Sequence, residues 1–302
     1  MKSYNETTSS SRNIKWISSG LILQLLLLGL ALLGSSCSKS NESTANQINF
    51  QSGPTNSPDG IINGTEIQLN DPVAQSTVGI YDAAKGISCT GVLVHKNMVL
   101  TAAHCSLSTP KNLTILFTTN FSTMNPARKY PFQRQVTKIA IGPYWQKNQN
   151  QLINTGDIAL LLFSGQIPNG YKPASVLFST QGFARGTPTV IAGYGMFNIN
   201  NFASTKVLRK TTLMIDNPTF SASELTINQS RGSSACIGDS GGPAYIFANN
   251  QYYVWGIIAR GNNETNENYC RNQGIISSIA FYKAWIQETA KQFLKTGNDN
   301  PQ

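Results

Sequence analysis

The sequence predicts an all-β fold for most of the chain. Short apolar runs, alternating or continuous, are separated by Gly, Pro and Asn, which is typical of strands and turns. A single stretch near the C-terminus has helical spacing instead. With 302 residues, 40% hydrophobic and only 12% charged, the chain can bury a large core in one or two domains.

The first element, residues 1–36, has the composition of a secretion signal. Basic residues precede an apolar run from Leu21 to Leu33, and small residues follow the run. A basic flank, an apolar stretch and small residues are the parts of a signal that is removed on export. We therefore expect a protein that is secreted or held in the cell envelope, in the periplasm, at the outer membrane or outside the cell.

Cys37 directly follows the small residues, an arrangement that resembles a bacterial lipoprotein signal. In such a signal the cysteine is lipidated and becomes the new N-terminus. Gly34 departs from the pattern, which usually has an aliphatic residue there. Two alternatives stay open. Ordinary cleavage would leave Cys37 as a free thiol, and an uncleaved signal anchor is disfavoured because the apolar run is short for a membrane span.

Residues 37–60 predict a disordered tether or propeptide. From Ser38 to Gly60 the chain is rich in Ser, Asn and Pro and has almost no apolar content. Such a segment cannot bury enough surface to fold.

The folded body begins at Ile61. Its predicted strands are residues 88–94, 98–101, 113–118, 158–163, 189–192, 254–259 and 275–279. The helical spacing covers residues 280–295 and predicts these buried positions: Phe281, Trp285, Ile286 and Phe293.

The formal net charge of +9 raises the possibility of an acidic partner. The basic residues are scattered, and the densest group, Arg128, Lys129 and Arg134, is typical of a solvated loop. Nucleic-acid binding is therefore not expected. Attraction to an acidic cell surface or to acidic substrates fits the charge better.

Three short motifs carry the candidate chemistry. They are Thr-Ala-Ala-His-Cys with His104, Gly-Asp-Ile-Ala-Leu with Asp157, and Cys-Ile-Gly-Asp-Ser-Gly-Gly-Pro with Ser240. A serine hydroxyl is too weakly acidic to attack an amide unaided and needs an adjacent base. His104 is the candidate base, since the only other histidine, His95, lies in a predicted turn. No Asp or Glu occurs between Cys105 and Asp157, which leaves Asp157 as the partner of the imidazole.

In order and spacing these motifs resemble the chymotrypsin/trypsin family of serine peptidases, over Ile61 to about residue 295. The resemblance implies a peptidase domain at residues 61–302. It would hold two antiparallel six-stranded β-barrels, at about 61–170 and 171–280, and a C-terminal helix at about 280–295. It also implies a monomeric endopeptidase that cleaves proteins or peptides through an acyl-enzyme and needs no cofactor.

The resemblance assigns a role to each motif residue. Ser240 would be the nucleophile, His104 the general base and Asp157 the group that orients the imidazole. The backbone N–H groups of Gly238 and Ser240 would form the oxyanion hole. No metal is expected, because the chain lacks the carboxylates of the calcium loop found in some relatives.

The resemblance also implies two disulfides, Cys89–Cys105 and Cys236–Cys270, which would require an oxidising compartment. The alternative is two pairs of free buried thiols.

Ile61 resembles the new N-terminus that forms when a precursor of the family is cut. The freed α-amine would pair with Asp239, and an activating protease would cut after Gly60. Because Asp59 and Gly60 precede the cut, that protease would not be trypsin-like. The alternative is that Ile61 simply begins a first strand.

The resemblance places Ser234, Ala235, Gly261 and Gly274 in the substrate pocket. Without a carboxylate at its floor, such a pocket predicts cleavage after aromatic or large aliphatic residues rather than after Lys or Arg.

Two residues depart from the family's pattern. Ala259 stands where a serine usually supports the aspartate, and Arg260 stands where a tryptophan usually lines the next subsites. Arg260 either favours acidic substrate residues or is solvated.

Two other function classes stay open. One is a catalytically silent binding protein of this fold, and the other is a surface adhesin displayed through Cys37. An intact set of three motif residues disfavours the first, and whether Ser240→Ala abolishes the phenotype distinguishes the second.

Overall fold

The computed structural model describes residues 50–51, 61–125, 128–198, 203–204, 206–262 and 270–295. The chain divides into two units, and all described residues belong to the second, Asn46–Gln302. The signal segment, Cys37 and the predicted cut after Gly60 lie outside the described residues. Among the helices of the described part, none has the length and apolar character needed to cross a bilayer.

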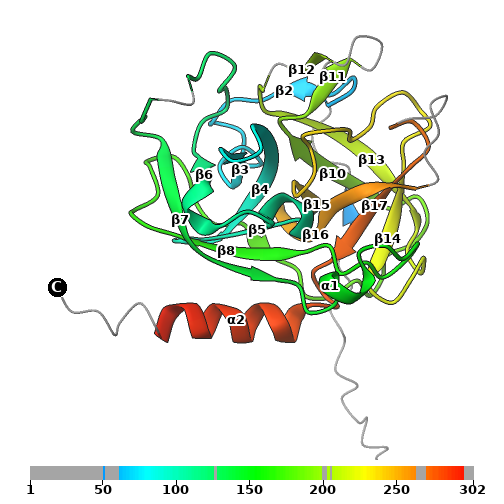
Figure 1. The fold of residues 1–302 in the computed structure, drawn as a ribbon. Helices are drawn as coiled ribbons and strands as arrows, with labels where there is room; N and C mark the ends of the chain where they lie inside the picture. Colours follow the sequence, from blue (N-terminus) through cyan, green and yellow to red (C-terminus); the bar gives the residue numbers. More distant parts are fainter. Residues whose placement is uncertain are drawn as a thin grey trace, which may run out of the picture. The chain divides into compact units, whose positions relative to one another are not determined.

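The first half of the folded body is a closed antiparallel barrel of six strands, in the order β3-β4-β5-β8-β7-β6 (Figure 1). These strands are β3 Thr77–Asp82, β4 Ile87–His95, β5 Met98–Thr101, β6 Leu113–Leu116, β7 Gln133–Ile141 and β8 Ala159–Phe163. Both β5 and β8 are completely buried, as expected for continuous runs of Met, Val, Leu and Phe.

The second half contains a second ring of six antiparallel strands, β15-β10-β13-β14-β17-β16, which the pairing of β15 with β16 closes. They are β10 Pro188–Gly193, β13 Arg209–Asn217, β14 Glu224–Asn228, β15 Pro243–Ala248, β16 Gln251–Asn262 and β17 Gln273–Ser278. Short strands attach outside the rings: β1 Phe50–Gln51, β2 Thr65–Glu66, β9 Ser175–Val176, β11 Met196–Asn198 and β12 Ala203–Ser204. Two six-stranded barrels with a C-terminal helix confirm the predicted fold.

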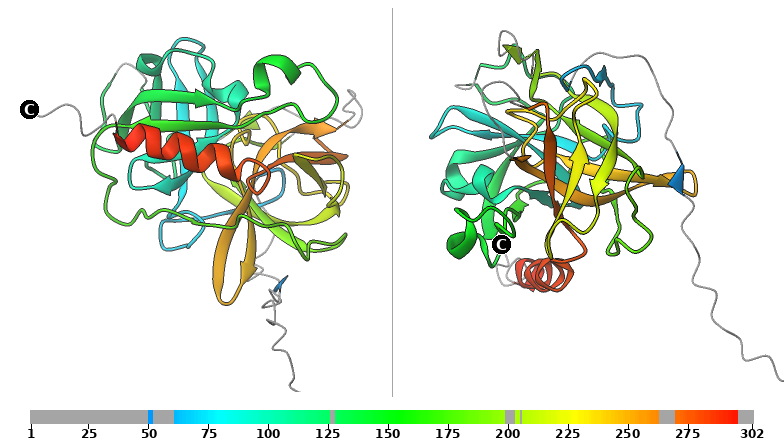
Figure 2. Two further views of the ribbon diagram at one scale, coloured as in Figure 1. Left: turned by 90° about the horizontal axis from the view of Figure 1, so that it is seen from below. Right: turned by 90° about the vertical axis from the view of Figure 1, so that its right-hand side faces the viewer.

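Helical structure is limited to four described segments: η1 Ala103–Ser106, η2 Pro110–Asn112, α1 Trp145–Asn148 and α2 Lys283–Lys295. The helix α2 lies along the first barrel and contacts β8 (Figure 2). Ile286 is 6% exposed and joins the core of that barrel, as predicted. Trp285 and Phe293 are partly buried against the same core.

The prediction for Phe281 is wrong. It precedes the helix, and its side chain is 43% exposed, because the chain turns before Lys283 and leaves the ring at the surface against Tyr144 and Tyr282. Tyr282 takes the buried position instead, at 2% exposure.

Two residues within the predicted tether form the short strand β1. Phe50 and Gln51 of β1 pair with Ala248 and Phe247 of β15. β10 pairs with β15 only near Ala244, so the far end of β15 keeps an open edge. Free backbone groups on such an edge accept any extended segment.

Candidate active site

His104 and Asp157 form a tight pair. The His104 Nδ1 atom lies 2.8 Å from Asp157 Oδ2, and the His104 backbone N–H donates to Oδ1 at 3.0 Å. The aspartate is buried, with its side chain 4% exposed, while the imidazole is 35% exposed. The two contacts fix the carboxylate in the plane where it can orient the ring and stabilise its protonated form.

The first barrel brings these two residues together through its strand pairing. β5 pairs with β8, with Thr101 opposite Ala159. His104 lies on η1 just after β5, and Asp157 lies just before β8. The antiparallel register therefore places the segment that leaves β5 beside the segment that enters β8.

The serine loop lies between β14 and β15 of the second barrel and turns sharply around Ser240. Gly238 has φ of +94°, a left-handed conformation that a side chain disfavours. A Cβ on Gly238 would also lie 2.8 Å from the Cα of Gly195. The glycine is therefore required for this turn.

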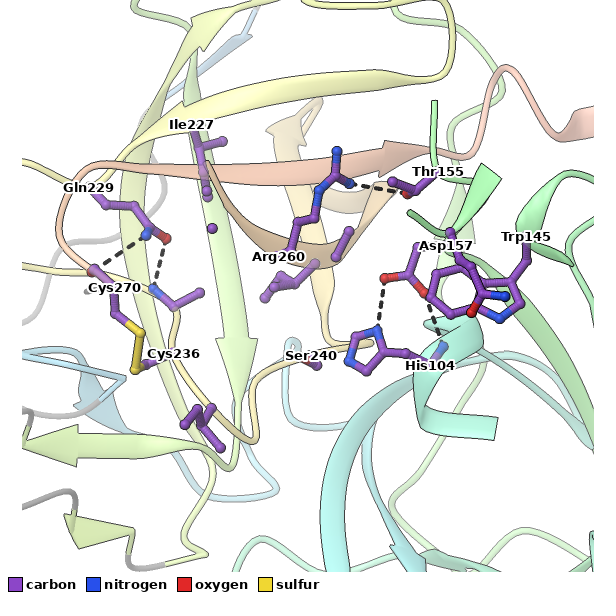
Figure 3. A pocket seen from close by; sticks show the side chains of 17 residues that line it. His104, Trp145, Thr155, Asp157, Ile227, Gln229, Cys236, Ser240, Arg260 and Cys270 are labelled. Atoms are coloured by element: carbon purple, nitrogen blue, oxygen red, sulfur yellow. Dashed lines mark hydrogen bonds and ion pairs between the residues drawn. A yellow bond between two sulfur atoms is a disulfide. The ribbon is translucent and has the colours of Figure 1, made fainter. Parts of the chain in front are cut away.

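Thr90 on β4 attaches the serine loop to the first barrel. Its N–H donates to the carbonyl of Ser240 at 2.9 Å, and its hydroxyl donates to the carbonyl of Gly238 at 2.8 Å. Thr101 in turn donates to the Thr90 carbonyl. Ser240 is thereby held beside the imidazole of His104, as Figure 3 shows.

The backbone N–H groups of Gly238 and Ser240 donate no hydrogen bond to any described residue. They flank Asp239, whose own N–H is engaged by Cys236. Two unengaged N–H donors, on either side of one residue and next to the Ser240 hydroxyl, are the arrangement needed to bind a developing oxyanion. The Ser240 hydroxyl also makes no hydrogen bond to the described part of the chain, as is common before substrate binds.

These residues line one open cavity of about 350 Å³. His104, Asp157 and Ser240 lie on one side of it (Figure 3). The predicted pocket residues Ala235, Gly261 and Gly274 also line it. Its other polar wall residues include Gln229 and Arg260.

A comparison with protein families matches this geometry: the trypsin family model covers residues 61–286. The chain belongs to the trypsin family. Chymotrypsin-like elastase family member 1 of Macaca fascicularis is 26% identical over 243 residues, which are 76% of this chain and 89% of that protein. The protein of the same name from Canis lupus familiaris is 28% identical over 240 residues, covering 75% and 90%. Vitamin K-dependent protein C of Rattus norvegicus is 26% identical over 249 residues, covering 75% and 50%.

Both disulfides implied by the family resemblance are present. Cys89–Cys105 joins β4 to η1 next to His104, and Cys236–Cys270 joins the serine loop to the start of the segment that leads into β17. Their sequence separations of 16 and 34 residues correspond to about 3–4 kcal/mol of stabilisation each on the chain-entropy model.

Ser234 differs from the other predicted pocket residues. It is 1% exposed, does not line the cavity, and its hydroxyl has no hydrogen-bond partner among the described residues. Gln229 lines the cavity instead: its amide oxygen accepts from the N–H of Ala235 at 3.0 Å. A Cβ on Gly274 would lie 2.7 Å from that oxygen, so the glycine leaves room for the Gln229 amide.

Asp239 is fully buried and forms no ion pair with a described residue. Its carboxylate accepts from the N–H groups of Gly195, at 2.8 Å, and Cys236, at 2.9 Å. Burial raises the pKa of Asp239 to about 7, although these two N–H groups and the charge of Arg209 act in the opposite direction. Burial without an ion pair therefore favours the protonated, neutral form of this carboxyl group.

Ile61 is buried at 1% exposure, and the adjacent Ile62 pairs with Ser234. Ile61 packs in the same cluster as Ala235. The segment that would follow the predicted cut thus lies along the residues that lead to Asp239.

Arg260 is partly exposed and is engaged by other residues of the chain. Its guanidinium bonds to both carboxylate oxygens of Glu224, at 2.7 and 3.2 Å. It also donates to the hydroxyl of Thr155 and to the carbonyl of Leu152. Ala259 lines the cavity and, as an alanine, offers Asp157 no side-chain hydrogen bond.

Sequence reasoning missed Thr90, Glu224 and Gln229. A usable signal existed for Glu224 and Arg260, because each is a lone charge within an otherwise apolar strand, Glu-Leu-Thr-Ile and Gly-Ile-Ile-Ala-Arg. Charges in such runs are rarely buried unless they are paired. No comparable signal marks Gln229, whose amide reaches the cavity only through the fold.

Proposed function

We propose that the chain is a serine endopeptidase that hydrolyses peptide bonds through an acyl-enzyme. The observation that carries this proposal is the cavity that His104, Asp157 and Ser240 line together, with the His104–Asp157 pair bonded at 2.8 Å. The unengaged N–H groups of Gly238 and Ser240 belong to the same loop as the serine. Membership of the trypsin family supports it.

The steps follow the general mechanism of the family. The Ser240 hydroxyl attacks the carbonyl carbon of the substrate, and Nε2 of His104 takes its proton. Asp157 holds the ring through Nδ1 and stabilises the imidazolium. The N–H groups of Gly238 and Ser240 bind the oxyanion.

His104 then gives the proton to the leaving amine, which breaks the peptide bond and leaves an ester on Ser240. Water, deprotonated by His104, attacks that ester and releases the acid product. Every proton in this cycle passes through one nitrogen atom, so the chemistry depends on how firmly Asp157 holds the ring.

The cavity favours an aromatic or large aliphatic residue before the cut. Ile227, Ala235 and Ile258 supply apolar lining, and among the described residues Asp157, which His104 engages, is the only carboxylate in the lining. Burial of a large uncharged side chain would therefore provide the binding energy. The amide of Gln229 lies where a phenol hydroxyl could donate or accept a hydrogen bond.

The active form arises by a cut after Gly60. The new α-amine of Ile61 would supply the cation that the buried Asp239 lacks. The placement of Ile61 and Ile62 along Ser234 and Ala235 supports this step. The precursor is exported by its signal segment and is held at the membrane through a lipid on Cys37 until that cut.

The test uses the Gly60→Arg chain, in which immobilised trypsin can make the cut and then be removed. We expect a fluorophosphonate probe to label the cut chain and not the Ser240→Ala control. The uncut chain should label weakly. Peptide substrates with Phe, Tyr, Leu, Lys or Asp before the cut then give the preference, and we expect the first three to be cleaved best.

Absence of labelling in a folded, cut chain would reject the peptidase and favour a binding protein of this fold. Equal labelling before and after the cut would keep the enzyme and reject the activation step.

A further inference from the structure

Within the described residues, His104 alone bonds to the Oδ1 and Oδ2 atoms of Asp157, so no second side chain there holds the carboxylate. Gly156 precedes Asp157 with φ of +78°, a backbone conformation that glycine adopts more readily than other residues. Contacts to the backbone of segment 152–157 therefore decide how firmly the aspartate is held.

Glu224 supplies contacts at this place. Its carboxylate is 1% exposed and accepts from the backbone N–H of Asn154 at 2.7 Å and of Thr155 at 3.1 Å. The Thr155 hydroxyl donates to the same carboxylate at 2.8 Å. Two successive peptide planes, just before Gly156, are thus held by one buried group.

Arg260 makes this buried carboxylate stable. It forms a two-point ion pair with Glu224 and donates to the Leu152 carbonyl at 2.8 Å. Burial on its own would raise the pKa of Glu224, but hydrogen bonds and charge from Arg260, with donors on Thr155 and Asn154, bring it below its ordinary value. The carboxylate is therefore ionised at neutral pH and can accept all of these bonds.

Two strands of the second barrel, β14 and β17, hydrogen-bond to the backbone of segment 152–157. Glu224 on β14 pairs in register with Ser277 on β17. The Ser277 hydroxyl donates to the backbone carbonyl of Asp157 at 2.9 Å. Neighbouring strands of one barrel thereby fix the backbone before and at the aspartate, which belongs to the other barrel. Figure 3 shows Arg260 reaching from its strand to Thr155, beside Asp157.

We propose that Glu224 and Arg260 are positioning residues for the reaction: together they hold the backbone before Asp157 so that its carboxylate stays aligned with His104. This inference rests on the proposed function. Ala259 cannot support the carboxylate of Asp157 with a side-chain hydrogen bond. Glu224 and Arg260 would instead support the backbone that carries the aspartate. On this proposal Arg260 serves the enzyme's own geometry rather than acidic substrate residues.

The test compares Glu224→Gln and Arg260→Met in the cut Gly60→Arg chain. We expect both variants to lose about tenfold to hundredfold in kcat while KM changes less than about twofold, because misplacement affects the chemical step. Loss should be larger for Glu224→Gln, since Glu224 accepts from two backbone N–H groups of the segment, while Arg260 supports Glu224 and holds the Leu152 carbonyl. The double variant should lose less than the two single losses combined.

A second readout does not need activity. The proton between His104 Nδ1 and Asp157 Oδ2 should give a low-field NMR signal, which we expect to shift or broaden in both variants. Lys210→Met is the matched control: Lys210 pairs with Asp71, is 16% exposed against 28% for Arg260, and lies on β13 outside the cavity lining. It should change neither kcat nor the signal.

Unchanged kcat and an unchanged low-field signal in both variants would overturn the proposal, whatever happens to their thermal stability. Losses in kcat that add fully in the double variant would assign separate roles and also overturn it. If near-UV circular dichroism shows that Glu224→Gln does not fold, Arg260→Met decides by the same criteria. An inactive parent chain would reject the proposed function, and the NMR signal would still test the pair.

Discussion

At the scale of single residues, Asp239 is the group whose surroundings would change in the proposed activation. In the uncut chain it is buried among backbone N–H groups without an ion pair in the described residues. After the cut, the amine of Ile61 would neutralise it. Precursor and enzyme should therefore respond differently to pH.

We expect the uncut chain to lose stability as pH rises from about 4 to 7. The pKa of Asp239 is raised from 3.8 to about 7, so the folded state favours the protonated form, and that stability disappears as pH passes through the folded pKa. The difference is on the order of 4 kcal/mol, at about 1.4 kcal/mol per unit. Urea unfolding at several pH values would measure it.

Asp239→Asn in the uncut chain is the control for this prediction, because it should remove the dependence. The cut chain, with its amine in place, should also lack it. Equal pH slopes for the cut and uncut chains would show that Asp239 gains no cation on cleavage.

Residues differ in how far sequence alone could place them. His104, Asp157 and Ser240 sit in motifs whose neighbours are diagnostic, and the structure brings all three to one cavity. The pocket position of Ser234 was not predictable, because it was inferred only from its distance along the chain to Ser240. Gln229, which directly follows β14, lines the cavity instead, and only the fold reveals this. Glu224 is separated from Asp157 by 67 positions, so only the docked barrels show their connection.

At the scale of elements, each predicted strand corresponds to a strand of the structure, but several strands were not predicted. The missed strands include β3 and β15, which are mostly apolar and buried. They also include β7 and β13, which begin with Gln-Arg-Gln and Arg-Lys-Thr-Thr, and much of their surface is only partly buried. Their place is fixed by pairing with neighbouring strands rather than by a periodic apolar pattern.

The helix α2 is attached mainly through Ile286, which packs into the core of the first barrel. We expect Ile286→Ala to lower the free energy of unfolding by about 2–4 kcal/mol, because it leaves a cavity at a buried site. The triad lies elsewhere, so kcat of the folded enzyme should stay unchanged.

Leu294→Ala on the same helix is the matched control. Leu294 is 40% exposed, and its loss should cost much less. Chemical denaturation of both variants measures the difference. A large drop in kcat for Ile286→Ala at a temperature where it is folded would show instead that α2 supports the cleft.

At the scale of the whole molecule, one cut after Gly60 would both activate the enzyme and free it from the membrane. No cysteine remains to hold the leading segment, since four of the five cysteines form the two disulfides of the body. The pairing of β1 with β15 covers two residues, which is too short to retain a separate peptide.

We therefore expect processed enzyme in the soluble fraction and uncut chain in the membrane fraction of the producing cell. Cys37→Ala should move the uncut chain to the soluble fraction and leave its later activation intact. Processed, active enzyme that stays membrane-bound through residues 38–60 would contradict this.

The division of the site between two barrels has a consequence for how the protein is made. His104 and Asp157 precede Ser240 in the chain and are therefore synthesised first. Thr90 can hydrogen-bond to the serine loop only after that loop has been synthesised. A chain that ends before Ser240 therefore carries the base without the nucleophile. Such a chain would lack the proposed peptidase activity, whether or not the leading segment has been removed.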